Sequence, residues 1–149
     1  MATQPTAEHA KQSLNVHVAA KGAEILEKYG PQIGWKQLLK ILEDRTAVRY
    51  PCEVVFDPSL LQPAELAYPA PKGAYPEDGF RVCVHPCFVM QLEYLPHIVL
   101  YQLVLVNYGE FASADDAETF GAAALGLAKE DYYQRLCRLA DELGEAGCC

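Results

Sequence analysis

LPHIVLYQLVLVNYGEFASADDAETFGAAALGL, the stretch from Leu95 to Leu127, decides how this chain folds. Its first half is apolar almost throughout, and Pro96 suits the first turn of a helix. Gly109 suits the C-terminal cap of that helix, and Ser113 suits the N-cap of a second helix with an acidic first turn. We therefore expect a pair of helices, the first of them central, with the rest of the chain packed around it.

Two helices are predicted before this stretch, over residues 6–29 and 33–44. Thr6 suits the N-cap of the first helix, Gly30-Pro31 ends it, and Trp35 is expected to anchor the packing between the two. A further helix is predicted over residues 129–143, where four apolar residues form one stripe: Tyr132, Leu136, Leu139 and Leu143.

The middle of the chain has a different character, because eight of the ten prolines lie between Pro51 and Pro96. Proline excludes long helices there, and alternating hydrophobic residues predict two short strands, over residues 52–56 and 80–84. Between them, residues 62–79 (Gln62 to Gly79) are predicted to form a long loop that is either functional or mobile. The predicted class is α+β: two N-terminal helices, a small antiparallel sheet and a three-helix C-terminal part.

Composition indicates a single globular domain over residues 1–149, with frayed ends at 1–5 and 145–149: 51% of the 149 residues are hydrophobic and 21% are charged. The formal net charge of -8 repels nucleic acid and anionic lipid, so neither nucleic acid nor a membrane is expected as a partner. Without a signal pattern or a spanning apolar run, a soluble cytoplasmic protein with six free thiols is expected.

The stretch VLYQLVLVNYGEFASADDAETFGAAALGL resembles the helix pair of zincin-like metallopeptidases. In that family one helix carries His-Glu-x-x-His and a later helix supplies a third metal ligand, often Glu. The resemblance covers about residues 47–127 and places Tyr101 and Leu105 at the two histidines, Gln102 at the catalytic glutamate and Glu118 at the third ligand.

The departures from the family pattern decide what the resemblance implies. Zinc needs ligands with available lone pairs, usually imidazole or carboxylate, which Tyr101 and Leu105 do not replace. The neutral amide of Gln102 cannot act as a general base. The resemblance therefore implies a zincin-like scaffold that is not a zinc hydrolase, with no catalytic residues and no cofactor.

Candidate binding residues gather around the central helix. His97 and Tyr101 are four residues apart and share a helix face with Leu105 and Tyr108. A functional interpretation makes this face the floor of a cleft with Gln102 and Glu118 nearby, so His97, Tyr101, Gln102 and Glu118 are the candidate binding residues. A buried helix face whose Tyr and His tips are hydrogen-bonded is favoured over that interpretation.

The most metal-like string is Cys83-Val84-His85-Pro86-Cys87. Strand alternation places Cys83 and His85 on one face, and thiolate and imidazole suit zinc or copper(I). Structural zinc sites use four ligands in paired knuckles, however, and no second pair occurs. A half-buried strand with incidental thiols is therefore favoured over a metal site at Cys83, His85 and Cys87.

Three classes of function stay open. The favoured one is a non-catalytic binding or protein-interaction module on a decayed zincin-like scaffold, with a protein partner or a homodimer. It is supported by tyrosines expected at the surface, where they suit interfaces: Tyr68, Tyr75, Tyr94, Tyr108, Tyr132 and Tyr133.

The alternative is a hydrolase with unorthodox acid–base residues. It requires at least two of four side chains to converge within hydrogen-bonding reach in one pocket: His85, His97, Glu110 and Glu118. The third class is a metal or redox site at Cys83, His85 and Cys87.

Overall fold

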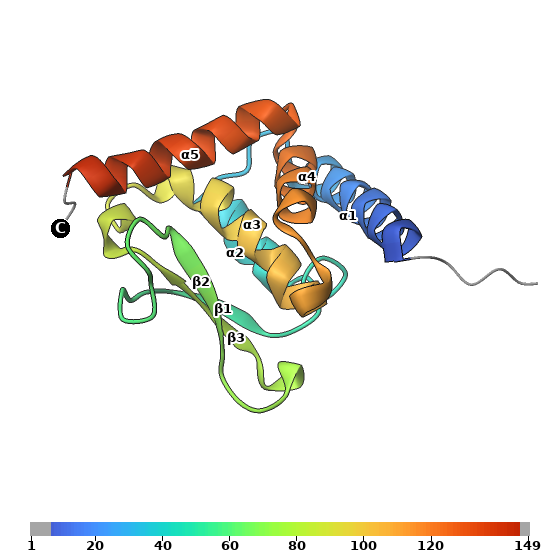
Figure 1. The fold of residues 1–149 in the computed structure, drawn as a ribbon, viewed down its shortest axis with the longest axis horizontal. Helices are drawn as coiled ribbons and strands as arrows, with labels where there is room; N and C mark the ends of the chain where they lie inside the picture. Colours follow the sequence, from blue (N-terminus) through green and yellow to red (C-terminus); the bar gives the residue numbers. More distant parts are fainter. Residues whose placement is uncertain (1–6, 147–149) are drawn as a thin grey trace, which may run out of the picture.

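A computed structural model describes residues 7–146 of the chain (Figure 1). Five helices form in this part: α1 (Ala7–Tyr29), α2 (Trp35–Glu43), α3 (Leu95–Tyr108), α4 (Ala114–Leu125) and α5 (Lys129–Ala146). Three strands form one sheet: β1 (Cys52–Phe56), β2 (Ala67–Pro71) and β3 (Phe80–Val84). The α+β class and the order of helices, sheet and helices are confirmed. Thr6 and residues 1–5 and 147–149 lie outside the described residues, whereas 145 and 146 continue α5.

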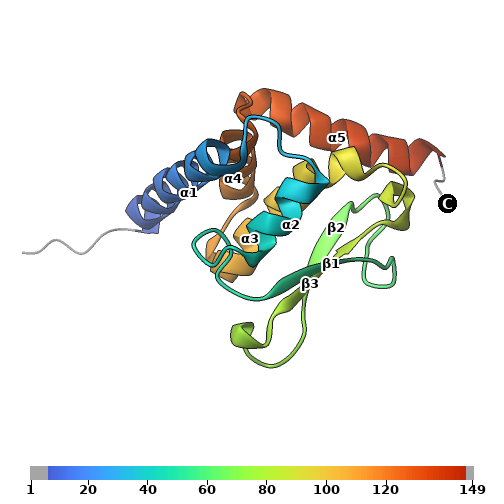
Figure 2. The ribbon, with the colours of Figure 1, turned by 180° about the vertical axis from the view of Figure 1, so that it is seen from behind.

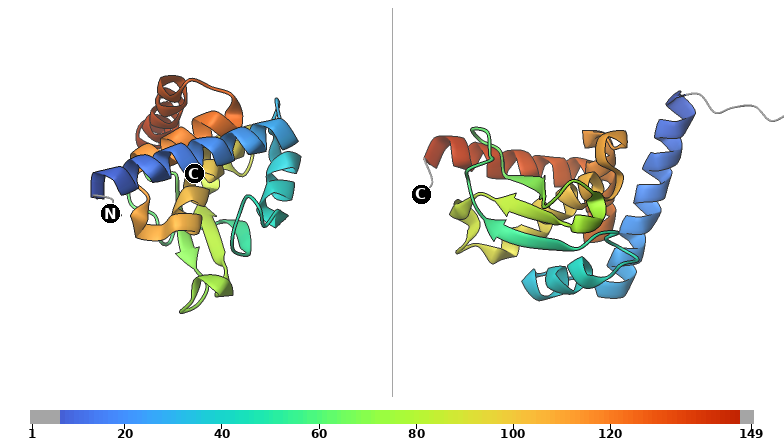
Figure 3. Two further views of the ribbon diagram at one scale, coloured as in Figure 1. Left: turned by 90° about the vertical axis from the view of Figure 1, so that its right-hand side faces the viewer. Right: turned by 90° about the horizontal axis from the view of Figure 1, so that it is seen from below.

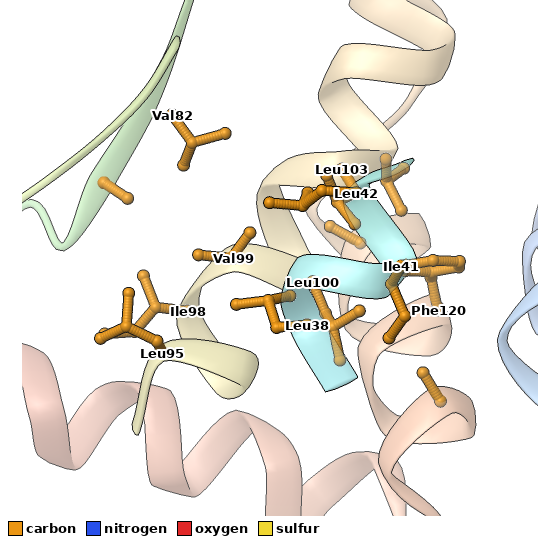
Figure 4. Close-up of a cluster of buried hydrophobic side chains, with 14 of the residues drawn as sticks. Leu38, Ile41, Leu42, Val82, Leu95, Ile98, Val99, Leu100, Leu103 and Phe120 are labelled. Carbon is orange, nitrogen blue, oxygen red and sulfur yellow. The ribbon is translucent and has the colours of Figure 1, made fainter. Parts of the chain in front are cut away.

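Helix α3 crosses the middle of the molecule because it is apolar on nearly every side. Ten of its 14 residues are buried. The sheet and α5 lie on opposite sides of α3 (Figure 1), and α2 lies over it when the molecule is seen from behind (Figure 2). In the core, Ile98 and Val99 lie toward Val82 of β3, whereas Leu100 lies beside Leu38 of α2 (Figure 4). Burial of this surface is the main driving force for the fold.

Helix α1 lies across one end of the molecule, against α4 (Figure 3). The two helices are in close contact at Gly22, where a Cβ atom would come within 2.6 Å of the Phe120 carbonyl oxygen. Trp35, at the start of α2, is half-buried and packs against the hydrophobic core. No helix among the residues that the structure describes has the length and apolar character needed to span a bilayer.

The sheet has the order β1-β3-β2 and is mixed, so the expected antiparallel sheet is wrong. Strands β1 and β3 are parallel, with Cys52 opposite Phe80, and β2 is antiparallel to β3, with Ala67 opposite Val84. The physical reason is the long connection between β1 and β3, which returns the chain to the same end of the sheet. That connection also supplies β2.

The segment expected as a loop, residues 62–79, therefore contains a strand as well as the short 3-10 helix Pro76–Asp78. Prolines are tolerated in β2 because it is an edge strand. The amide of His85 donates to the carbonyl oxygen of Leu66 (3.0 Å), and that of Lys72 donates to Gly79 (2.9 Å). The backbone groups of the even-numbered residues of β2 therefore hydrogen-bond to β3, and those of Pro69 and Pro71 point to the open edge of the sheet.

Asn107, near the C-terminal end of α3, fixes the segment that leads into β1. Only 7% of this residue is exposed. Its Oδ1 accepts a hydrogen bond from the Arg49 amide (2.9 Å), and its Nδ2 donates to the Ala47 carbonyl oxygen (2.9 Å). The buried amide is therefore hydrogen-bonded through both of its polar atoms, as buried polar groups normally are.

Replacement of Asn107 tests this link. We expect Asn107→Ala to lower the free energy of unfolding by about 2 kcal/mol, because the Arg49 amide and the Ala47 carbonyl would lose their partner in a buried position. Urea denaturation measures the change. Gln134→Ala, at an exposed position on α5, is the control and should change the free energy little. A negligible loss in Asn107→Ala would contradict the role given to this side chain.

Candidate functional site

A cleft of about 740 Å³ opens between β2 and α5, with α3 as its floor. We call it the β2–α3 cleft. It is lined by residues 64–69, by Ile98, Tyr101, Gln102 and Leu105 of α3, by Gly109, Glu110, Ala112 and Ala114, by Glu118 of α4, and by Tyr133, Leu136, Cys137 and Ala140 of α5. The four residues of α3 stand at positions i, i+3, i+4 and i+7 and so form one face of the helix. The half-buried residues of α3 are His97, Tyr101, Leu105 and Tyr108, of which Tyr101 and Leu105 lie in this cleft.

Three of the four candidate binding residues line this cleft together, namely Tyr101, Gln102 and Glu118. The fourth, His97, lies one turn earlier and lines a smaller pocket beside α5, where its Nε2 is 3.0 Å from Nη1 of Arg135. Burial, and then the positive charge of Arg135, lower the pKa of His97. Helix α5 passes over the start of α3, where Tyr132 of α5 donates a hydrogen bond to the His97 carbonyl oxygen (2.6 Å). The helix face that includes His97 and Tyr101 is therefore divided between two pockets.

Gln102 is the most unusual side chain in the β2–α3 cleft. Only 8% of the residue is exposed, yet no residue within the described part of the chain hydrogen-bonds to its side-chain amide. The polar atoms of this amide remain accessible from the open cleft, since His97 Nδ1 is the one fully buried side-chain nitrogen or oxygen without a partner among the described residues. Asn107, five positions later on the same helix, differs because both of its side-chain polar atoms are hydrogen-bonded to protein groups. The donor and acceptor of Gln102 are therefore available to a molecule in the cleft.

Glu118 reaches the cleft because the start of α4 is firmly fixed. The Ser113 hydroxyl oxygen accepts from the Asp116 amide (3.2 Å), and Asp116 Oδ2 accepts from the Ser113 amide (3.0 Å), which together form a capping box. Asn15 of α1 also donates to Asp116 Oδ1 (3.0 Å). This bonded first turn holds Glu118 against the cleft wall.

The electrostatic environment of the cleft disfavours negative charge on its own groups. Burial is the main cause that raises the pKa of Glu118. The nearby positive charge of Lys129 lowers this pKa and so opposes the effect of burial. Burial, and then the charge of Glu118, also raise the pKa of the Tyr101 hydroxyl. Lys129 itself forms an ion pair with Asp115. Titratable groups with shifted pKa values that lie together in one cleft are typical of binding and catalytic sites.

The open edge of β2 supplies hydrogen-bond acceptors to the rim of the cleft. In the observed register the backbone of Ala67 and Pro69 faces away from β3, and both residues line the cleft. Ala67 has an amide hydrogen, but Pro69 has none. The rim therefore offers two carbonyl oxygens and a single N–H donor.

Side chains proposed for hydrolysis divide between the cleft and other places. Glu110 and Glu118 both line the cleft, whereas His97 lies in the smaller pocket and His85 lines neither. His85 instead caps a short 3-10 helix, where its Nδ1 accepts a hydrogen bond from the Cys87 amide (3.1 Å).

The cysteines form no metal centre among the described residues, where no group of three or more His, Cys, Asp or Glu side chains is placed to hold an ion. Cys52, Cys83 and Cys137 are free thiols, as expected, but Cys87 is disulfide-bonded, so the expectation of free thiols is wrong there. Burial is the main cause that raises the pKa of the buried Cys83 thiol.

Two walls of the cleft were not predicted from the sequence. One wall is β2, which was not recognised as a strand because of its prolines. The other wall is α5, which contributes Tyr133 and Cys137. Tyr132 was expected at the surface, which is wrong: it is fully buried, and Gly121 of α4 lies against its ring. The stripe of Leu136, Leu139 and Leu143 already indicated that Tyr132 faces inward and Tyr133 does not.

Comparison of the chain with models of known protein families, with curated proteins and with solved structures finds no match. The chemistry of the cleft is therefore the basis on which a function can be proposed.

The shifted pKa of Glu118 leads to a prediction about stability. Because burial raises the pKa of Glu118 in the folded state, folding disfavours its ionised form. This loss of stability is absent below about pH 4, where the side chain is protonated in both the folded and the unfolded state. It develops as the pH rises through the folded-state pKa. Glu118→Gln should therefore gain stability relative to the native protein between about pH 4 and pH 7.

Denaturation at both pH values measures the gain. Glu93→Gln, an exposed position outside the cleft, is the control. A Glu118→Gln variant whose relative stability falls or stays constant as the pH rises would contradict the shift.

Proposed function

We propose that this protein is a non-catalytic binding module on a zincin-like scaffold, and that the β2–α3 cleft is its ligand site. The observation that carries the proposal is the unpartnered amide of Gln102, which lies on the floor of the cleft with only 8% of the residue exposed. Folding therefore leaves a hydrogen-bond donor and an acceptor directed to the cleft and not to another protein group. A ligand with matching polar groups would hydrogen-bond to both.

The size and lining of the cleft support this proposal. Its volume of about 740 Å³ lies within the range of roughly 300–1,000 Å³ that is usual for small-molecule sites. Apolar side chains such as Leu66, Ile98 and Leu136 form much of the wall, and a few polar groups converge among them. An apolar wall with few polar groups is the usual composition of a ligand pocket.

The scaffold proposal rests on the position of four residues. Tyr101, Gln102, Leu105 and Glu118, which the resemblance places at the metal and catalytic positions, all line one cleft beside the edge strand β2. Their side chains do not supply the ligands of a zinc site. A scaffold of this kind would keep the cleft and use it for binding alone.

We also propose that the protein is cytoplasmic and that it forms a homodimer or binds a protein partner. The second part of this proposal is motivated by large apolar side chains at the surface, among them Phe111 with 89% and Met90 with 87% of the residue exposed. Aromatic residues and methionine are enriched at protein interfaces.

Filling the cleft tests the binding proposal. Titration of the native protein with a library of small apolar fragments, followed by NMR, should shift the backbone amides of Ala67, Gln102 and Glu118. Ala140→Trp places a large ring at the α5 wall and should abolish these shifts.

Gln134→Trp, at an exposed position of the same helix outside the cleft, should leave the shifts unchanged. Fragments that bind elsewhere, or that bind Ala140→Trp as well as the native protein, would contradict the proposal.

Restoring the missing residues tests the scaffold. The triple variant Tyr101→His, Gln102→Glu and Leu105→His is expected to bind one equivalent of zinc with Glu118 as third ligand, because the positions would recreate the ligand set of the family. Addition of Glu118→Gln to the triple variant should weaken zinc binding at least about tenfold. Metal analysis and calorimetry measure both. A folded triple variant that binds no zinc would contradict the scaffold.

A further inference from the structure

We propose that the β2–α3 cleft is selective for organic amines, that is, for molecules with a protonated amino group on an apolar body. This inference rests on the function proposed above and names the class of ligand that the same cleft would take. Charge, hydrogen-bond acceptors and aromatic rings in the cleft all favour this class.

The charged residues that line the cleft are all acidic. They are Glu65, Glu110 and Glu118, and no lysine, arginine or histidine belongs to the lining formed by the described residues. Lys129, outside the lining, lies close enough to lower the pKa of Glu118 but is itself paired with Asp115. Opposite charges attract strongly where water is partly excluded, so a cation is favoured and an anion is repelled.

The cleft contains hydrogen-bond acceptors without protein partners among the described residues, together with donors from Gln102 and the tyrosine hydroxyls. A protonated primary amine has three N–H donors and no acceptor. The rim offers the edge carbonyl oxygens of Ala67 and Pro69, and the floor offers the side-chain oxygen of Gln102 and the Glu118 carboxylate. Because Pro69 lacks an N–H, this edge receives donors better than it receives a carboxylate or another acceptor.

Aromatic rings add to the preference for a cation. Tyr68 of β2, Tyr101 of α3 and Tyr133 of α5 line three sides of the cleft. The face of an aromatic ring attracts a cation electrostatically, and an alkylammonium group gains from this contact more than an alcohol does. The apolar body of the ligand would contact Leu66, Leu105 and Leu136, which also line the cleft.

Three probes with one chain length test the inference: octylamine, octanol and octanoate, which are cationic, neutral and anionic at about pH 7. Each is titrated into the native protein and followed by NMR at the amides of Ala67, Gln102 and Glu118. We expect octylamine to bind at least about tenfold more tightly than octanol, and octanoate to bind least.

Glu118→Gln separates charge recognition from burial of the alkyl chain. It should weaken octylamine binding at least about tenfold and leave octanol binding nearly unchanged, because only the charged partner is removed. Glu93→Gln removes an exposed glutamate outside the cleft and should leave all three affinities unchanged. The melting temperature of each variant confirms that it is folded.

The outcomes distinguish this inference from the function on which it rests. Equal affinities for octylamine and octanol, or an amine preference that survives Glu118→Gln, would overturn selectivity for amines while leaving the cleft as a ligand site. If none of the three probes shifts the cleft, the inference is wrong, and the fragment titration with Ala140→Trp decides separately whether the cleft binds anything.

Discussion

The need to cover α3 on all sides determines the arrangement of the rest of the protein. A helix with ten buried residues out of 14 cannot lie at the surface, so other elements must enclose it. The sheet, α2, α4 and α5 together provide that enclosure. Their cover is incomplete at Tyr101 and Leu105, which are half-buried, and the β2–α3 cleft opens at this place.

Two side-chain amides on α3 are similarly buried but differ in their hydrogen-bond partners. Asn107 bonds to the backbone of residues 47 and 49 and thereby fixes the approach to β1. Gln102 is equally buried but bonds to no described residue, and it faces the cleft. Burial alone does not distinguish the two side chains. The presence or absence of a protein partner does, and Gln102 is the one that a ligand would satisfy.

The helices could be predicted from the sequence because their signals are local. Gly109, Ser113 and the apolar stripe of α5 mark caps and faces within a few residues of where they act. Strand direction in the sheet could not be predicted, because alternation along Cys52–Phe56 and Phe80–Val84 is the same for parallel and antiparallel pairing. Strand β2 was hidden because its prolines are compatible only with an edge, and edge position is a property of the whole fold.

The floor of the cleft could be anticipated from the sequence, since Tyr101 and Gln102 share one helix and α4 follows directly after it. Its walls could not, because β2 and α5 meet α3 only after long-range packing. A crystal structure of the protein tests the existence of the cleft most directly. An open space between β2 and α5, with the Gln102 amide bonded to water or to a bound molecule, is the predicted result. A collapse of α5 onto α3, with Gln102 bonded to protein groups, would contradict it.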